Sequence, residues 1–164
     1  MKLFKYMMFV IGVLAIAACS QNKTVVKVAP FKIEQEQINL SADALFKFNK
    51  ATKEDLLPSG IQALDGLVSK LKTNYVEIKQ ISLVGHTDRL GSDDYNYRLG
   101  LARADTIKNY LIERGISSVF ETSSAGKTQP VSKNCVGNKL TKELTECLAE
   151  DRRVVVTIQG IRKN

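Results

Sequence analysis

The chain has 164 residues, a formal net charge of +7, 44% hydrophobic residues and 25% charged residues. This length suits a single domain, and the composition excludes a chain that is disordered throughout and a multi-helix membrane protein. Trp is absent, aromatic residues make up 7%, and the basic residues are scattered. We therefore expect no nucleic-acid partner.

Residues 1–18 have the pattern of an export signal. Two lysines precede an apolar stretch over residues 7–18, which is shorter than the roughly 20 residues that a membrane span needs. The tetrapeptide IAAC at 16–19 resembles the bacterial lipobox, and this resemblance implies cleavage before Cys19 and acylation of that residue. Because Ser20 rather than Asp follows, it also implies an outer-membrane anchor with the domain facing the periplasm. An ordinary secretory signal with a chance cysteine is the alternative.

The remaining cysteines fit this compartment. If Cys19 carries lipid, Cys135 and Cys147 are left, and in an oxidising periplasm they can form a disulfide worth about 3 kcal/mol. We expect this disulfide to stabilise the domain without forming the binding site. A metal site is the alternative, but the only histidine, His86, is far away in the sequence and there is no C-x-x-C pair. We expect neither a metal nor a cofactor.

Beyond the signal, the composition predicts a short tether and one domain. Residues 19–37 comprise the lipidated cysteine and a polar, Lys- and Gln-rich tether, although its valines and isoleucine allow part of it to form a strand. The domain is expected over residues 38–161, and residues 162–164 form a tail.

Hydrophobic spacing predicts an α/β fold, in which the strands can form one sheet covered by helices. Strands are expected at 38–48, 77–85, 119–125 and 154–158, and the last, being wholly apolar, is expected to be central. Helical spacing begins at 58–60 and again at 95–114, where Gly115 ends the helix. A long insertion over 126–151 contains a short helix near 140–148.

The turn after the second predicted strand is a candidate ligand site. Sites in open α/β sheets lie beyond the carboxyl ends of strands, which is where Asp88 falls. In the next helix Arg103 shares a face with three apolar residues, and a guanidinium in such a stripe needs an anionic partner. The two side chains could form one pocket for a ligand with an ammonium and a carboxylate. The alternatives are a structural Asp88–Arg103 ion pair and an aspartate that caps the helix.

A family resemblance sharpens this interpretation. The stretch GHTDRLGSDDYNYRLGLARADTIKNYL at 85–111 resembles the signature of the OmpA-like peptidoglycan-binding domain. The flanks LFKFNKATKEDLLPSGIQALDGL, GISSVFETSSAGKTQPV and CLAEDRRVVVTI also fit, so the resemblance covers residues 38–161. It implies the OmpA-like β-α-β-α-β-(α)-β fold, an α/β fold (an α+β sandwich) in which helices pack on one face of a mixed sheet.

The resemblance also implies a ligand, the diaminopimelate of the peptidoglycan stem peptide, bound noncovalently. The family's ligand residues fall on Asp88 for the ammonium and Arg103 for the carboxylate, with Asn96 at the pocket edge. The cysteine pair resembles that of enterobacterial OmpA. Gly91 supplies the turn, whereas Gly100 replaces the family's usual serine and puts the fine geometry of the pocket in doubt.

These features predict a protein that tethers the outer membrane to the cell wall. The alternative is a peptidoglycan-anchored adaptor subunit of a larger envelope machine, such as a secretion, motor or conjugation-type apparatus. We expect no enzyme and no catalytic residues, because His86 has neither a serine in a nucleophile elbow nor a metal partner in the sequence.

Overall fold

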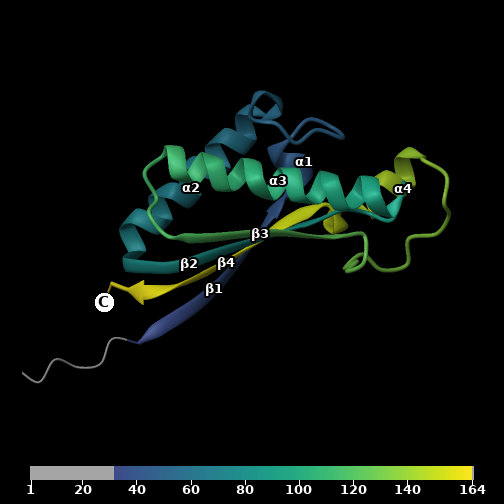
Figure 1. Cartoon of the computed structure of the whole chain (residues 1–164). Coiled ribbons are helices and arrows are strands. Elements are labelled where there is room, and N and C mark those ends of the chain that lie inside the picture. The colour runs from purple at the N-terminus through teal and green to yellow at the C-terminus, as the bar shows by residue number, and fades with distance from the viewer. Residues whose placement is uncertain (1–31, 164) are drawn as a thin grey trace, which may run out of the picture. The chain divides into compact units, whose positions relative to one another are not determined.

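The computed structural model describes residues 32–163 (Figure 1). The predicted signal peptide, Cys19 and most of the predicted tether therefore lie outside the described residues. The described chain forms one mixed sheet in the order β1-β4-β2-β3. Its strands are β1 (Ile33–Ser41), β2 (Tyr75–His86), β3 (Val119–Gly126) and β4 (Arg153–Arg162). The apolar β4 is central, as expected: it pairs antiparallel with β1 and β2, while β2 and β3 are parallel.

The helices cover one face of this sheet, which confirms the predicted fold class. Figure 1 shows α2 (Pro58–Asn74) and α3 (Asp93–Glu113) on the same side of the strands. The shorter α1 (Ala42–Leu45) and α4 (Lys142–Cys147) lie toward the end of the sheet where β2 finishes. Single 3₁₀ turns occur at Lys53–Asp55 and Ala149–Asp151. The core between the sheet and the helices is aliphatic, and its fully buried members include Leu64, Leu71, Ile81, Leu83, Ile107, Leu111, Val154, Val156 and Ile158.

The first strand begins and ends earlier than the predicted 38–48. Ser41 accepts a hydrogen bond from the backbone of Ala44 and so starts α1, because a serine in this position caps a helix better than it continues a strand. At the other end, residues 33–37 belong to β1 and not to a tether. The sequence allowed a strand in part of this segment, but its polar composition favoured a tether. Glu36 lies on the helix-facing side of the strand, where Lys70 and the Tyr75 hydroxyl bind its carboxylate.

A glycine pair sets how closely α3 approaches the sheet. A Cβ on Gly85 of β2 would lie 1.9 Å from the carbonyl oxygen of Gly100 in α3, and a Cβ on Gly100 would lie 2.4 Å from the Ser124 hydroxyl of β3. The two backbones can approach this closely only because neither residue has a side chain. Gly100 therefore faces the sheet and is absent from the lining of the pocket described below. Gly100 therefore serves the packing of α3 on the sheet and does not shape the pocket directly.

Two other features of the described residues bear on function. Between residues 32 and 163 no helix is both long enough and apolar enough to cross a membrane. The same part of the chain holds no group of three or more His, Cys, Asp or Glu side chains placed to bind a metal ion.

Candidate functional site

A cavity of about 320 Å³ opens where β2 ends and α3 begins. It lies beyond the carboxyl end of a strand, as the sequence predicts. The turn residue Gly91 has φ +91°, a left-handed conformation that glycine adopts without strain. All three predicted ligand residues line this cavity, together with Arg152, which directly precedes β4. The lining comprises Phe48, Asn49, Thr87, Asp88, Leu90, Gly91, Tyr95, Asn96, Leu99, Arg103, Asn138, Leu140, Thr145 and Arg152.

Asp88 is fixed by two contacts, neither of which involves Arg103. One carboxylate oxygen accepts a hydrogen bond from the backbone N–H of Leu90 at 2.9 Å, and the other accepts one from the Arg152 guanidinium at 2.8 Å. Arg152 also binds Asp43 through Nε and Nη2, at 2.6–3.0 Å. These contacts with Asp43, ahead of those with Asp88, raise the pKa of Arg152. The alternative of a structural Asp88–Arg103 ion pair is therefore not found, because Arg152 is the ion-pair partner of Asp88.

Arg103 is buried without a carboxylate. It is 2% exposed, its Nε donates to the Lys50 carbonyl at 3.0 Å, and its guanidinium carbon lies 5.8 Å from the centre of the Phe46 ring. In the described part of the chain its Nη1 has no hydrogen-bond partner, and none of its nitrogens forms an ion pair. Burial lowers the pKa of Arg103, but arginine remains cationic in proteins. The cavity is thus lined by a buried cation that makes no direct ion pair in the described part of the chain.

Two neutral polar side chains complete the inner surface. Asn96 is 2% exposed, and its amide donates to the Leu90 carbonyl at 2.8 Å, so it braces the turn that carries Asp88. Thr87 is 4% exposed, and its hydroxyl has no partner among the described residues. Its backbone N–H donates to the Gly126 carbonyl. An unpartnered buried hydroxyl is costly, so Thr87 is a further candidate for contact with a ligand.

The cysteines form the expected disulfide, and the segment that it closes lies at the cavity. Cys135 and Cys147 are bonded, with 5.7 Å between their Cα atoms. The segment that they close supplies Asn138, Leu140 and Thr145 to the cavity lining. Neither cysteine lines the cavity, whereas the segment between them does, and the sequence did not predict that contact. The segment is far from Asp88 in the sequence, so its contact with the cavity was not predictable from spacing. It lies between the end of β3, which is parallel to β2, and the start of β4, which pairs with the end of β2.

His86 is buried beside the site and not in it. It is 3% exposed, pairs in register with Arg153, and its Nδ1 has no partner among the described residues. Burial, and to a lesser extent the charge of Arg153, lower the pKa of His86 to about 4. The imidazole is therefore neutral near pH 7, and it is absent from the cavity lining.

The sequence analysis did not identify Arg152 or Thr87 as site residues. Arg152 had a usable signal, because two arginines directly precede a strand of valines and must find anions or carbonyls where that strand enters the core. Thr87 had none of its own, since a threonine beside a strand end is ordinary. Phe48 was assigned to a strand face and instead lies at the cavity, after β1 has ended.

The fold and the pocket together define a small α/β binding domain with a charged, partly apolar cavity at one end of its sheet. A family model described as "OmpA family" matches residues 45–143, and the chain belongs to this family. The family match confirms the expectation of a binding domain and not an enzyme. The chain is 40% identical over 132 residues to Outer membrane protein A of Citrobacter freundii, a match that covers 79% of this chain and 54% of the relative. The chain thus spans about half the length of this curated relative.

Solved structures share the fold at lower identity. The periplasmic domain of Helicobacter pylori MotB superimposes with a TM-score of 0.57 at 20% identity, covering 77% of this chain and 76% of that one. The peptidoglycan-associated lipoprotein from Burkholderia pseudomallei gives a TM-score of 0.53 at 24% identity, covering 71% of this chain and 88% of that one. At these identities the likeness establishes the fold alone.

Proposed function

We propose that this pocket binds peptidoglycan through the diaminopimelate of the stem peptide, and that the chain tethers the outer membrane to the cell wall. The observation that carries the proposal is Arg103, a buried cation that lines a cavity and has no carboxylate partner in the described chain. An unpaired buried charge destabilises a protein. Such a residue makes physical sense where a ligand supplies the missing anion.

The charges around the cavity match a zwitterion. Asp43 and Asp88 balance Arg103 and Arg152, so the four side chains sum to zero. The end of a diaminopimelate side chain carries one ammonium and one carboxylate, and it adds no net charge. The planar guanidinium of Arg103 can take the carboxylate in a bidentate contact. Asp88, held by Leu90 and Arg152, can accept hydrogen bonds from the ammonium, with Thr87 and Asn96 as neutral neighbours.

Sedimentation with sacculi tests this proposal. The full chain, purified in a non-ionic detergent, should pellet with sacculi of the diaminopimelate type and leave them undigested. Sacculi whose stem peptides carry lysine at the third position lack the second carboxylate and should retain little protein. Equal recovery with both wall types would overturn the assignment of the ligand, and release of soluble muropeptides would overturn a purely binding role.

The membrane end of the tether rests on the lipobox-like sequence at 16–19. We propose that Cys19 is the lipidated N-terminal residue of the mature chain and that it holds the protein at the outer membrane. Acyl chains contribute about 0.8 kcal/mol per buried CH₂, so two or three of them are sufficient for stable attachment. The relatives named Outer membrane protein A support the same compartment. The alternative role as an adaptor of a larger envelope machine stays a prediction, and crosslinking in cells would identify such a partner.

A further inference from the structure

The segment from Cys135 to Cys147 forms one side of the cavity, and its contacts indicate a role in recognition. Leu140 of this segment is 68% exposed and lines the cavity mouth, and Phe48, from the loop after α1, is 60% exposed and lines the same cavity. The polar groups lie deeper, since Arg103 and Asn96 are each 2% exposed. The cavity therefore has a charged floor, and its exposed rim combines the apolar side chains of Phe48 and Leu140 with Asn49 and Asn138.

We infer that the disulfide-closed segment is a ligand-binding wall, and that Leu140 on this wall and Phe48 in the same lining contact the aliphatic chain of the bound residue. This inference rests on the proposed function. A ligand whose ammonium and carboxylate reach the buried floor must pass its methylene groups across the rim, where Phe48 and Leu140 offer apolar contact. The rim thereby favours an amino acid with a zwitterionic end on an aliphatic side chain, and exposed apolar side chains gain free energy when such a chain covers them.

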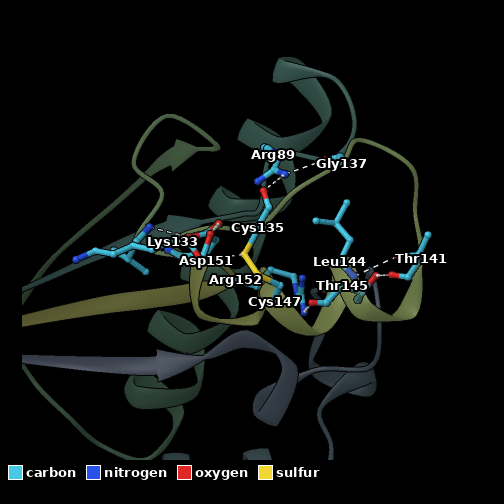
Figure 2. The surroundings of a disulfide bond; sticks show 12 residues. Arg89, Lys133, Cys135, Gly137, Thr141, Leu144, Thr145, Cys147, Asp151 and Arg152 are labelled. Atoms are coloured by element: carbon cyan, nitrogen blue, oxygen red, sulfur yellow. Dashed lines mark hydrogen bonds between the residues drawn. A yellow bond between two sulfur atoms is a disulfide. The ribbon is translucent and has the colours of Figure 1, made fainter.

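Four restraints hold the wall against the rest of the site. The disulfide joins its two ends, and the Arg89 guanidinium donates to the carbonyls of Cys135 and Gly137 at 2.7 and 2.8 Å. Arg152 donates to the Thr145 carbonyl at 2.9 Å. Figure 2 shows Arg89 directed at the first half of the segment and Arg152 beside Thr145 in α4.

The fourth restraint anchors the chain just ahead of the wall. Asp151 accepts hydrogen bonds from the backbone N–H groups of Val131 and Ser132 and from the Ser132 hydroxyl, at 2.7–2.8 Å. These contacts lower the pKa of the Asp151 carboxyl against the opposing effect of its burial, which is the largest single influence.

Arg89 links the wall to the floor. It follows Asp88 directly, so one turn carries both the carboxylate that we assign to the ligand ammonium and the guanidinium that holds the opposite wall. Arg89 is therefore a positioning residue. It donates hydrogen bonds to two carbonyls of the wall, and the wall in turn contacts the ligand. A wall that is fixed before the ligand arrives loses less conformational entropy on binding.

A matched pair of substitutions tests the rim. Leu140→Ser removes an exposed leucine that lines the cavity, whereas Val136→Ser removes a 90% exposed valine of the same segment that does not. Titration calorimetry of the full chain in detergent with a purified diaminopimelate-containing muropeptide should show binding weakened about tenfold by Leu140→Ser, the scale expected for losing partial burial of one leucine. Val136→Ser should bind like the parent. Equal affinities for parent and Leu140→Ser would overturn the inference, while a parent that fails to bind would overturn the proposed function instead.

A second set of substitutions tests the restraints. Cys135→Ser with Cys147→Ser, and separately Arg89→Met, should each weaken muropeptide binding at a temperature where circular dichroism shows the folded protein, and Arg89→Lys should restore part of the loss. Unchanged affinity in both variants would show that the wall needs no positioning. If the double cysteine variant does not fold, the Arg89 series and the Leu140/Val136 pair still decide the question.

Discussion

Two arginines line the cavity in opposite electrostatic situations. Arg152 is paired with Asp43 and Asp88, whereas Arg103 is buried without a carboxylate partner in the described chain. A side chain that stabilises the free protein and one that awaits a ligand should respond differently to removal. Stability and binding measured on the same variants therefore separate the two roles.

We expect Arg103→Ala to lose most muropeptide affinity and to change the free energy of unfolding by less than about 1 kcal/mol. Removing one member of a desolvated charge pair costs about 2–5 kcal/mol of binding, roughly 30- to several-thousand-fold in affinity. In the free protein the lost packing is offset, because an unpaired cation no longer has to be buried. Arg103→Lys should rescue poorly, since an ammonium lacks the planar fork of a guanidinium. Calorimetry and urea unfolding provide the two readouts, and a large loss of stability with intact binding would make Arg103 structural.

Arg152→Ala, in contrast, should act mainly on stability and lower the free energy of unfolding of the free protein by about 2–4 kcal/mol. It leaves Asp88 and Asp43 without their shared partner and the Thr145 carbonyl without a donor. The estimate stays below that for a fully buried pair because the Asp43 side chain is 39% exposed. Urea unfolding at neutral pH measures the effect, and a parent-like midpoint would show that the network contributes nothing to folding.

The buried His86 predicts a loss of stability in acid. Its pKa is about 4 in the folded protein, below the ordinary value of 6.5. The unfolded chain therefore binds more protons between these two pH values, so stability falls as the pH drops from 6.5 toward 4. At pH 5 the contribution of this residue is on the order of 2 kcal/mol. The difference in unfolding free energy between parent and His86→Gln, followed from pH 7 to pH 5, isolates it from the carboxylates. A pH-independent difference would contradict the assignment.

At the scale of elements, the space around two helical glycines predicts opposite effects of a Gly→Ala substitution on stability. Gly100→Ala should destabilise the domain by about 1–2 kcal/mol, because the new Cβ meets the Ser124 hydroxyl at 2.4 Å and the Gly85 carbonyl oxygen at 3.0 Å. Gly66→Ala in α2 should stabilise it by about 0.5–1 kcal/mol, because the described structure has no heavy atom within 4 Å of that position. Thermal unfolding of both variants tests the pair, and stabilisation by Gly100→Ala would show that α3 can move away from the sheet.

The elements with strong hydrophobic periodicity were predictable from the sequence, and those shaped by polar side chains were not. The spacing of α2 and the apolar run of β4 placed both within a few residues, since the core they face is aliphatic. For the first half of β1 the sequence allowed a strand without predicting its bounds, because Glu36 occupies an inward position that a pattern of apolar residues does not reveal. In the site, the helical face that carries Arg103 was visible in the sequence. That Arg152 lines the same cavity was not visible, because the two arginines are 49 residues apart. The pairing of Arg153 with His86 at the start of β4 brings Arg152 to the site.

At the scale of the whole molecule, the pocket and the start of the domain lie at opposite ends of the sheet. β1 runs nine residues, about 30 Å, from Ile33 to Ser41, which pairs with Arg153 beside the pocket. If Cys19 is the lipidated residue, the chain from there to Lys32 can span at most roughly 45–50 Å. A fully extended tether over residues 20–37 would reach roughly 60 Å, and β1 takes up part of that length. Together the two lengths limit how far from the membrane the pocket can reach.

Anchoring and wall binding should therefore be separable by substitution. Cys19→Ala should abolish metabolic labelling with a radioactive fatty acid and release the protein from outer-membrane fractions, while sedimentation with sacculi persists. Arg103→Ala should keep the label and lose the sacculi. Undiminished label in Cys19→Ala would show that another residue carries the lipid.

Arg103 is assigned here to bind the carboxylate of a zwitterionic side chain. Calorimetry with two synthetic stem peptides, identical except for diaminopimelate or lysine at the third position, tests it most directly. We predict that the parent binds the diaminopimelate peptide at least about thirtyfold more tightly, and that Arg103→Ala reduces this affinity to the level of the lysine peptide. Equal affinity of the parent for the two peptides, or a preference that survives in Arg103→Ala, would contradict the account.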